Sequence, residues 1–367
     1  MLICPSFFDG HFDGIGRVSS AFYESIVCLT GRQPFVLSSN ENRMTCAPEV
    51  GRCYERVYGR MLIDAIVGRF EQSCLKTTPI VCTHLSLSPV ARILGWRLRR
   101  PYRLFIHGIE CWQALVKRSR WGLTGAAVIL ANSKYTQQTF LECNPWAASI
   151  PSRVVPLGVT ACIATTGPRS LPSLGFRVIA VGRLTKDAIY DRYRASDDLY
   201  KGFKQLILAI GIVAKEYPLS RLTIVGDGDA RPELEQWLAT RPERALVDIL
   251  GRLPDERLSE EYRKSDVFAL PSEGEGFGIV FVEAMAHHLP CVCVAAGAVP
   301  EVVEDGVTGL VAQPRNIVDL AAKLSRLAAD RAFCEQLGAN ASRRFQERYS
   351  VEKFQGRVLD VLKATSV

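Results

Sequence analysis

The sequence predicts an α/β protein with two Rossmann-like domains, each built around a doubly wound parallel sheet. Two observations predict this class. Short apolar runs alternate with helical patterns in both halves of the chain, and this alternation is typical of parallel sheets that helices cover on both faces. The length of 367 residues also exceeds what one hydrophobic core usually covers, so we expect two domains.

Apolar runs bounded by turn residues mark the expected strands. In the first half these runs are residues 1–8, 35–38, 79–85, 102–108, 127–133 and 152–159. In the second half they are residues 176–184, 220–228, 246–253, 267–272, 290–296 and 309–314. Apolar residues at helical spacing indicate intervening helices over residues 16–29, 201–217, 255–265 and 277–288.

A stretch of small residues with proline and glycine, 160–174, separates the two halves. We therefore expect an N-terminal domain over residues 1–162, a linker over 163–174 and a C-terminal domain over 175–348. A polar stretch, 185–200, is predicted to be a loop. The last segment, 349–367, is predicted to be a helix that packs on a partner and can cross back to the first domain, because it carries Phe354, Val358, Val361 and Leu362 at helical spacing.

The composition is that of an ordinary globular protein. The twelve cysteines show no regular spacing and no C-x-x-C pair, so we expect reduced, buried thiols, including Cys291 and Cys293 on one face of a buried strand. The first residues lack the features of a secretory signal, and no window reaches the ~20 apolar residues of a membrane span. These features predict a cytoplasmic protein that does not cross a bilayer.

The positive charge is concentrated in the first half. Residues 1–160 carry 18 lysine and arginine residues against 10 acidic ones, whereas the rest of the chain is nearly balanced. Much of the excess lies beside Trp96, Trp112 and Trp121, in Arg97, Arg99, Arg100, Arg103, Lys117, Arg118 and Arg120. Arginine beside tryptophan suits an anionic membrane surface, so the protein can associate peripherally with the inner membrane. A solvated face explains the pattern equally well, and nucleic acid is not expected, because no recognition motif accompanies the charge.

The segment "PSEGEGFGIVFVEAMA", residues 271–286, carries the chemistry. It follows a predicted strand and begins a helix, and in a doubly wound sheet ligands bind at that edge. Backbone amides of Gly276–Gly278 and the positive end of the helix would face an anion. Glu275 at the turn and Glu283 in the helix can each accept hydrogen bonds from hydroxyl groups. A ligand with both phosphate and hydroxyls, such as a nucleotide sugar, uses all of these groups.

The sequence resembles the retaining glycosyltransferases of the GT-B fold, family 4, also called glycosyl transferases group 1. The resemblance rests on "EGFGIVFVEAMA" with Glu275-x7-Glu283, and on further segments in the family's order. These are "FDGIGRVSSAF", "LFIHGIE", "ANSKYTQQ", "VVPLGV", "VGRL", "YKGFKQLILAI", "IVGDGD", "LGRLPDERLSEEYRKSDVFALPSEGEGFG" and "GAVPEVVEDGVTGLV". The set covers most of the chain and implies two domains that face a cleft.

The resemblance also implies the roles of individual residues. Glu283 would bind the ribose, Glu275 the hydroxyls of the donor sugar, and Arg183 and Lys201 the diphosphate, whose charge grows as the glycosidic bond breaks. His107 would position the donor sugar, and Leu253 would lie beside the base. The remaining donor-binding residues would be Gly14 and Gly16 in the N-terminal glycine loop, with Gly276, Phe277 and Gly278 in the motif. The catalytic set is Glu275, His107, Arg183 and Lys201.

Two departures from the family's pattern affect these assignments. About seventeen residues separate Arg183 from Lys201, whereas the family's spacing is short, so Lys186 remains an alternative to Lys201. The family's glycine before "LP" is His288 in this chain. A histidine there can crowd the end of the helix but does not touch the motif glutamates.

Other motifs have structural explanations that we prefer. The G-x-G-x-x-S of residues 14–19 lacks the third glycine and the acidic residue of an NAD or FAD site. Asp227-Gly228-Asp229 resembles a metal-binding D-x-D, but it follows a strand and is predicted to be a turn. His287 and His288 are adjacent on a helix and point in different directions, so we predict structural roles for both.

The predicted function is transfer of a hexose from a nucleoside-diphosphate sugar to a glycan or lipid-diphosphate-linked acceptor in surface polysaccharide synthesis. The resemblance implies a retaining, metal-independent enzyme without a cofactor, in which domain closure brings Gly14 and His107 onto the donor. GDP-mannose is slightly preferred, with UDP-glucose or UDP-N-acetylglucosamine possible. The alternatives are a nucleotide-sugar epimerase of the same fold, a phosphorylase, for which no pyridoxal lysine is marked, and a non-catalytic nucleotide-sugar-binding subunit.

Overall fold

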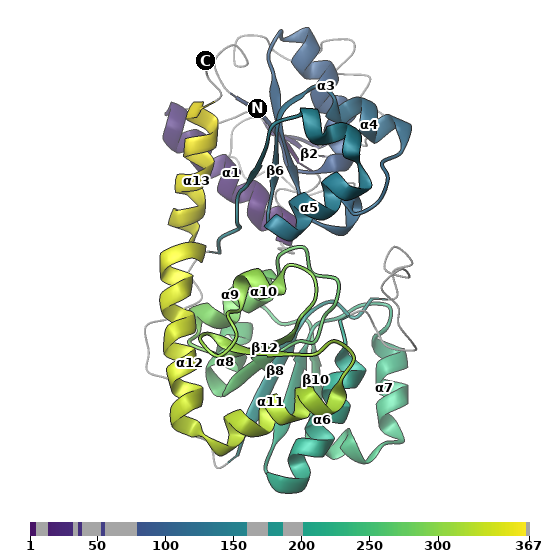
Figure 1. Ribbon diagram of the computed structural model, residues 1–367, viewed down its shortest axis with the longest axis vertical. Helices are drawn as coiled ribbons and strands as arrows, with labels where there is room; N and C mark the ends of the chain where they lie inside the picture. The colour runs from purple at the N-terminus through teal and green to yellow at the C-terminus, as the bar shows by residue number, and fades with distance from the viewer. Residues whose placement is uncertain are drawn as a thin grey trace. The chain divides into compact units, whose positions relative to one another are not determined.

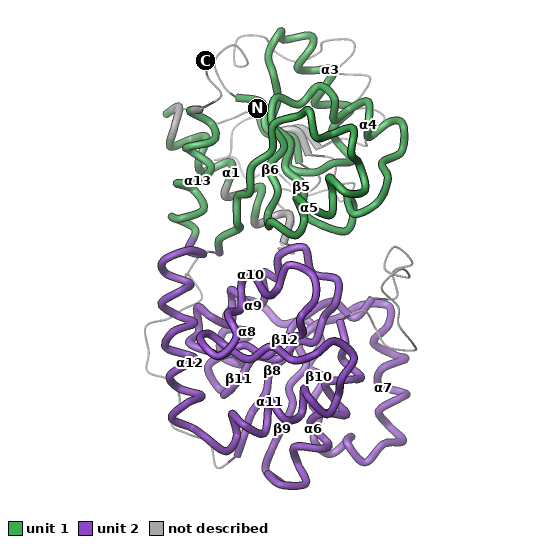
Figure 2. Tube along the Cα trace, in the orientation of Figure 1, with its two compact units in different colours: residues 1–158, 351–367 green, residues 159–350 purple. Residues whose placement is uncertain are grey.

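The computed structural model describes residues 1–4, 14–31, 36–38, 53–55, 79–159, 175–185 and 201–364 of the chain. They form two compact units (Figure 2). Unit 1 comprises residues 1–158 and 351–367, and unit 2 comprises residues 159–350. The predicted linker, 163–174, and the predicted polar loop up to residue 200 lie outside the described residues.

Unit 1 contains a parallel sheet in the strand order β3-β2-β1-β4-β5-β6-β7 (Figure 1). The described strands are β1 (Leu2–Cys4), β2 (Val36–Ser38), β3 (Cys53–Glu55), β4 (Ile80–Cys82), β5 (Tyr102–Ile106), β6 (Ala126–Ala131) and β7 (Ser152–Val154). In the register of the sheet centre, Leu104 of β5 pairs with Cys82 of β4 and Ile129 of β6. Six of these strands are those that the sequence predicts, and β3 at the sheet edge is an addition.

The helices among the described residues of unit 1 are of two kinds. The α-helices are α1 (Gly14–Thr30), α3 (Ser88–Arg97), α4 (Lys117–Leu123), α5 (Lys134–Cys143) and α13 (Val351–Ala364). The short 3₁₀ helices are η2 (Leu85–Leu87), η3 (Ile109–Cys111) and η4 (Pro145–Ser149). The helix α3 contacts α4, so these two helices form one surface of unit 1.

The C-terminal helix α13 belongs to unit 1 and packs against α1 (Figures 1 and 2). Its apolar face is buried, and the ring of Phe354 meets the ring of Phe22 on α1 edge to face at 5.6 Å. Phe22 in turn meets Phe105 of β5 at 5.4 Å, so the aromatic contact runs from α13 through α1 to the sheet. The last segment of the chain is therefore part of the core of the first unit.

Unit 2 contains a parallel sheet in the order β10-β9-β8-β11-β12-β13 (Figure 1). Its strands are β8 (Arg177–Val181), β9 (Arg221–Val225), β10 (Val247–Gly251), β11 (Val267–Ala269), β12 (Cys291–Val294) and β13 (Gly309–Ala312). Phe268 of β11 pairs with Ile179 of β8 and Cys291 of β12. All six strands are predicted from the sequence.

The helices of unit 2 cover both faces of its sheet. They are α6 (Phe203–Glu216), α7 (Arg231–Ala239), η7 (Pro242–Leu246), α8 (Asp255–Lys264), α9 (Ile279–Ala286), α10 (Val299–Val302), α11 (Ile317–Ala329), α12 (Arg331–Arg344) and the π-helix η8 (Phe345–Tyr349). Parallel crossovers are right-handed. The crossover through α6 therefore lies on one face, where α6 contacts α11, and the reversed crossovers through α8 and α9 lie on the other.

The core of each unit has the content that the sequence predicts. Cys291 and Cys293 are buried in β12, and burial raises the pKa of both thiols. None of the cysteines whose side chains are described forms a disulfide. Within the described ranges, no helix combines the length and apolar character that a membrane crossing requires. The observed architecture, two parallel sheets each covered by helices, is the predicted fold class.

The packing of α13 predicts a large effect of Phe354→Ala. The substitution removes a fully buried ring, so we expect the free energy of unfolding to fall by about 3–5 kcal/mol. Urea denaturation followed by circular dichroism measures this change. Asp360→Ala on the exposed side of the same helix is the matched control and should change stability by less than about 0.5 kcal/mol. Equal stability of the two variants would contradict the packing of α13.

Candidate functional site

The candidate site of unit 2 lies where the strand order reverses. The chain runs from β8 outward to β9 and β10, and then crosses to β11 on the other side of β8. The loop after β8, residues 182–185, and the loop after β11, residues 270–278, are therefore connected to helices on opposite faces of the sheet. A doubly wound sheet binds its ligand beyond the carboxyl ends of the strands at such a point.

The loops after β8 and β9 are in direct contact at this edge. The backbone amide of Leu184 donates to the carbonyl oxygen of Asp227 (3.1 Å), and the amide of Ala230 donates to that of Leu184 (2.9 Å). Gly226 has a φ of 147°, and a Cβ atom there would lie 1.8 Å from the carbonyl oxygen of Gly182. Only glycine fits this approach, so the glycine of the segment "IVGDGD" has a packing role.

The D-x-D sequence forms a turn, as predicted. Asp227 Oδ1 accepts a hydrogen bond from the amide of Gly228 (2.9 Å), and its second oxygen lies 3.8 Å from Arg231 Nη1. The carboxylate of Asp227 therefore serves the turn and an ion pair. In the part of the chain that the structure describes, no three His, Cys, Asp or Glu side chains are grouped to hold a metal ion.

Lys201 lies between the two loops of the candidate site. Gly202, which precedes α6, has a φ of 72°, and a Cβ atom there would lie 2.6 Å from the carbonyl oxygen of Pro271. This contact holds the start of α6 against the end of β11. The stem of Lys201 lies beside Gly182, 3.7 Å from the position of a Cβ atom there, and its ammonium group forms an ion pair with Glu275.

The backbone of Glu275 is fixed by the loop after β12. Its carbonyl oxygen accepts a hydrogen bond from the amide of Ala298 (2.9 Å), and Gly297 packs directly against its backbone. Glu273, two residues earlier, forms a two-pronged ion pair with Arg315, with Nε–Oε1 at 3.1 Å and Nη2–Oε2 at 3.0 Å. Arg315 lies in the loop after β13 and was not singled out from the sequence, because only the fold brings it to residue 273.

The glycine turn leads into α9 as predicted. Gly276 and Gly278 lie between Glu275 and the first residue of α9. Backbone amides in the first turn of a helix have no acceptor within the helix and point out from its N-terminus. The ring of Phe277 is buried and meets Tyr349 edge to face at 5.8 Å. Phe277 therefore anchors the turn through its side chain, and its backbone remains the part predicted to face the donor.

Glu283 is a buried carboxylate with a hydroxyl partner. It lies in the second turn of α9, has 6% of its surface exposed, and accepts a hydrogen bond from the hydroxyl of Tyr262 on α8 (3.3 Å). Glu283 is therefore a buried carboxylate, whereas most glutamates on helices are exposed. Tyr262 is itself buried and was missed from the sequence, where it is one aromatic residue on a charged helix.

The two adjacent histidines after α9 have the structural roles that the sequence predicts. His287 is buried, its Nδ1 donates to the carbonyl oxygen of Glu283 (2.8 Å), and its Nε2 accepts from the hydroxyl of Ser259 (2.9 Å). Its ring also stacks on Tyr262 at 4.8 Å. His288 is exposed, and its Nε2 lies 3.3 Å from the hydroxyl of Ser342. These contacts join α9 to α8 and α12.

Two further predicted donor-site residues lie at the same edge of the sheet. Arg183 is exposed in the loop after β8, next to Gly182. Leu253 is half-buried in the loop after β10, two strands away from β8. Lys186, the alternative to Lys201, lies outside the described residues. The structure brings Lys201 and Glu275 into contact and places Arg183 on the neighbouring loop.

In unit 1, His107 occupies the corresponding edge of the sheet, at the end of β5. Its Nε2 donates to the carbonyl oxygen of Thr83 (2.6 Å), which fixes the ring orientation, and its backbone amide donates to Glu110 Oε1 (2.6 Å). The side-chain amide of Asn132 donates to the carbonyl oxygen of His107. The histidine is thus held by the ends of β4, β5 and β6.

His84 is a second histidine at this edge that we did not single out from the sequence. It follows β4, and its Nδ1 accepts from the amide of Ser86 (3.2 Å) at the start of η2. The rings of His84 and His107 stack with centroids 6.2 Å apart. The sequence could have indicated His84 as a site residue, because it directly follows an apolar run, as His107 does.

Gly14 and Gly16 lie in the first turn of α1, which begins at Gly14. The resemblance assigns them to a glycine loop, and the residues before them, 5–13, are outside the described part of the chain. The structure therefore shows these two glycines as the start of a helix, and their approach to a donor stays a prediction.

The predicted basic surface is correct for most of its residues and wrong for Arg103. That side chain is 4% exposed, because β5 is an interior strand, and its Nη2 donates to the carbonyl oxygen of Leu362 on α13 (3.1 Å). Trp112 is buried as well. The exposed members are Arg97, Arg99, Lys117, Arg118 and Arg120, with Trp96 (79% exposed) and Trp121 (45% exposed), and Arg100 is half-buried.

The exposed part of this surface is formed by α3, α4 and their connecting loops. The guanidinium of Arg92 lies over the ring of Trp121 at 4.5 Å, and that of Arg120 lies over Trp146 at 4.7 Å. Cation–π contacts hold these tryptophan rings and guanidinium groups on the surface of unit 1. We name the exposed residues Trp96, Arg97, Arg99, Lys117, Arg118, Arg120 and Trp121 the α3–α4 surface.

Comparison with solved structures defines the fold. The Anabaena protein HepE, crystallised in complex with UDP, has a TM-score of 0.78 to this chain at 20% identity, and the match covers 99% of both chains. The chain therefore has the GT-B fold, with two Rossmann-like units, as the sequence resemblance implies.

Comparison of sequences finds relatives for the second half of the chain. Residues 193–344 match the family model described as Glycosyl transferases group 1. A sulfoquinovosyl transferase of Arabidopsis thaliana is 32% identical over 151 residues, 40% of this chain and 29% of that protein. A D-inositol 3-phosphate glycosyltransferase of Corynebacterium kroppenstedtii is 33% identical over 149 residues, 39% of this chain and 33% of that protein. The match thus spans no more than a third of either relative.

The hydrogen bond from Tyr262 to Glu283 predicts the effect of Tyr262→Phe on stability. The substitution removes a hydroxyl that a buried carboxylate accepts, so the free energy of unfolding should fall by about 1–2 kcal/mol. Chemical denaturation of the wild type and the variant measures this difference.

Tyr217→Phe is the matched control for this experiment. Tyr217 also donates to a glutamate, Glu216 Oε1 at 3.2 Å, but this bond lies on the surface, and its loss should cost less than about 0.5 kcal/mol. If Tyr262→Phe were no more destabilising than Tyr217→Phe, Tyr262 would not be supporting Glu283.

Proposed function

We propose that the chain is a retaining, metal-independent glycosyltransferase that transfers a hexose from a nucleoside-diphosphate sugar to a glycan or lipid-diphosphate-linked acceptor. The single observation that carries this proposal is the assembly of Lys201, Glu275 and Glu283 at the strand reversal of unit 2. A cation and two buried carboxylates at the ligand-binding edge of a sheet match a ligand that combines phosphate with hydroxyl groups.

The cations of the site support the departure of a diphosphate. When the bond between the anomeric carbon and the phosphate oxygen breaks, the electron pair stays on the leaving nucleoside diphosphate. Lys201 and Arg183 would stabilise this growing charge from fixed positions, which favours the transition state over the bound donor. In the proposed reaction the acceptor oxygen bonds to the same face of the sugar, and its proton passes to a phosphate oxygen. Two protein cations then take the role that a divalent ion has elsewhere.

The carboxylates of the site support recognition of hydroxyl groups. Glu283 would accept hydrogen bonds from the ribose and Glu275 from the donor sugar, while Leu253 would contact the base and the amides around Gly276 and Gly278 the phosphates. The burial of both glutamates favours this role, because hydrogen bonds to a charged group are stronger away from water.

The donor is a nucleotide sugar whose base and hexose are for experiment to decide. The slight preference of the sequence is GDP-mannose, whereas HepE, similar in fold, has been crystallised with UDP-glucose. Both UDP- and GDP-sugars are therefore candidates, and both belong in the first measurement.

We assign acceptor recognition to unit 1. Residues 1–160 carry the excess positive charge of the chain, which suits an anionic acceptor, while His107, Gly14 and Gly16 of the same unit are expected to approach the donor. The α3–α4 surface would bring this unit to an anionic membrane, where a lipid-diphosphate acceptor is presented. The chain would then be a peripheral enzyme of surface polysaccharide synthesis.

The first prediction from this function is specific binding of a nucleotide sugar. We expect calorimetry in EDTA to show binding of one donor from a panel of GDP-mannose, UDP-glucose and UDP-N-acetylglucosamine. Glu283→Ala should weaken that donor roughly 10- to 100-fold, because charge-assisted hydrogen bonds to the ribose are lost. Turnover with a candidate acceptor would then separate an enzyme from a binding subunit.

Glu256→Ala is the control for charge removal, because Glu256 is an exposed carboxylate on α8. It should bind the donor like the wild type. No binding of any donor either with or without EDTA, or equal binding by Glu283→Ala and the wild type, would overturn the nucleotide-sugar site. Binding that EDTA abolishes would overturn metal independence alone.

The second prediction concerns the membrane. Vesicles with phosphatidylglycerol should co-sediment the protein, and vesicles of phosphatidylcholine alone should not. Each basic residue near an anionic surface contributes about 1 kcal/mol, so Arg118→Ala with Arg120→Ala should weaken binding roughly 30-fold. Added salt should weaken the wild type in the same direction.

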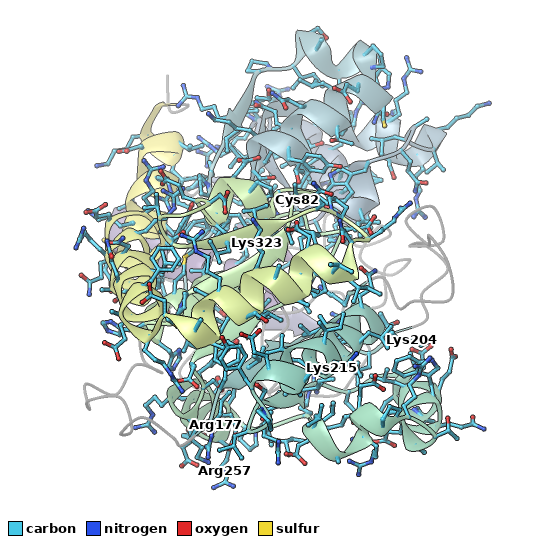
Figure 3. The ribbon with its side chains drawn as sticks, turned by 60° about the horizontal axis from the view of Figure 1, so that its bottom comes forward. Cys82, Arg177, Lys204, Lys215, Arg257 and Lys323 are labelled. Carbon is cyan, nitrogen blue, oxygen red and sulfur yellow. The ribbon has the colours of Figure 1, made fainter. Side chains whose placement is uncertain are left out.

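A pair of basic residues on unit 2 provides the control. Arg257 and Lys264 are exposed on α8, with Arg257 labelled in Figure 3, and their double substitution to alanine removes the same charge. It should leave vesicle binding unchanged. Equal losses in the two double variants would mean that net charge, rather than the α3–α4 surface, governs binding.

A further inference from the structure

The ion pair between Lys201 and Glu275 joins two groups that the proposed function assigns to different parts of the donor. Lys201 would hold the diphosphate, and Glu275 would hold the sugar. In the structure these side chains hold each other, and each is 12% exposed. The diphosphate and the carboxylate are both anions. If both lay against the same ammonium group, they would repel each other, which would weaken binding of the diphosphate.

The pair is held in place from both sides. The stem of Lys201 runs beside Gly182, and Gly202 anchors the start of α6 against Pro271. The backbone of Glu275 is fixed by the amide of Ala298 at 2.9 Å. Because both backbones are anchored, the fold sets the positions from which the two side chains meet. A change of partner therefore needs only rotation of the side chains.

Two neighbouring charged residues, Lys204 and Glu273, have ion-pair partners of their own. Lys204, three residues after Lys201, extends toward α7, where its Nζ lies 3.6 Å from Glu233 Oε1 and 5.7 Å from the ring centroid of Trp237 (Figure 3). Glu273 is paired with Arg315. The site therefore contains two glutamates in one loop with different cationic partners.

We propose that Glu275 and the diphosphate of the ligand compete for the ammonium group of Lys201, so that the site favours the sugar-bearing donor over the free nucleoside diphosphate that the reaction releases. This inference rests on the proposed function. A nucleotide sugar offers hydroxyls to the carboxylate that its diphosphate displaces from Lys201. A nucleoside diphosphate offers no sugar hydroxyls. Its binding therefore breaks the ion pair and leaves Glu275 without a new hydrogen bond from the ligand. The competition thus assists product release.

The experiment compares the affinities of nucleoside diphosphates and their sugars for four forms of the full chain. UDP, GDP, UDP-glucose and GDP-mannose are titrated by calorimetry into the wild type, Glu275→Gln, Lys201→Met and the double variant. Glutamine keeps the shape of the side chain and removes the charge that competes for Lys201. The contact of residue 275 with Ala298 involves only the backbone, so we expect the substitution to preserve it.

The proposal predicts opposite effects of Glu275→Gln on the two kinds of ligand. The nucleoside diphosphate should bind roughly three- to tenfold more tightly, the size expected from losing a partly buried ion pair. The corresponding nucleotide sugar should bind no more tightly than to the wild type, because its hydroxyls lose a charged acceptor. In the Lys201→Met background, Glu275→Gln should give no gain for the diphosphate.

Glu273→Gln is the matched control, because it removes the same charge from the same loop but from a different ion pair. Glu273→Gln should not raise the affinity for the nucleoside diphosphate. Equal gains from Glu273→Gln and Glu275→Gln, or no gain from Glu275→Gln, would overturn the proposal while leaving the nucleotide-sugar site intact. If neither diphosphate nor sugar binds the wild type, the proposed function fails, and this inference fails with it.

Glu275→Asp provides a second route should the glutamine variant fold poorly by circular dichroism. Its shorter side chain keeps the charge but moves it away from Lys201, so the diphosphate should gain affinity to a smaller degree. A loss of diphosphate affinity in this variant would show that Glu275 supports the ammonium group rather than competing for it.

Discussion

The reversal of strand order between β8 and β11 is the constraint on which the site of unit 2 depends. Because the crossovers on the two sides of β8 lie on opposite faces of the sheet, the loops after β8 and β11 leave the same edge toward opposite faces. Close backbone approaches then fix the loops, as at Gly226 against Gly182 and Gly202 against Pro271. The side chains on the loops, Lys201 among them, inherit their positions from this packing.

Three glutamates at this edge differ in the chemistry of their partners. Glu275 faces an ammonium group, Glu273 a guanidinium fork, and Glu283 a tyrosine hydroxyl. A two-pronged arginine pair is geometrically locked and suits the anchoring of a loop. A single ammonium is a point charge with rotatable donors, so another anion can replace its partner. A tyrosine hydroxyl donates one neutral hydrogen bond to a carboxylate. One residue type can thus anchor, exchange partners or bind a polar ligand within one loop and helix.

The sequence predicted the parts of the fold that a local pattern encodes. The strand before Glu275, the glycine turn and the helix carrying Glu283 were all expected, because apolar runs and glycines mark them. The edge strand β3 was not, since three residues at a sheet edge carry too little pattern. Partners contributed by distant segments were also missed. Tyr262 and Arg315 reach the glutamates only because the fold brings their segments together. Arg103 is buried on an interior strand and contacts the backbone of Leu362, 259 residues away in the sequence.

His288 stands where the sequence resemblance implies a glycine, and its backbone has a conformation that glycine adopts readily. His288 adopts a φ of 59°, a left-handed conformation that costs a residue with a side chain roughly 1–2 kcal/mol. Its imidazole lies against the hydroxyl of Ser342, and its carbonyl oxygen lies 2.3 Å from where a Cβ atom of residue 338 would be, which requires Gly338 on α12. The residue with the left-handed backbone is thus held by contacts between the end of α9 and α12. Since it falls after the last turn of α9, the helical register that sets Glu283 relative to Glu275 is unaffected.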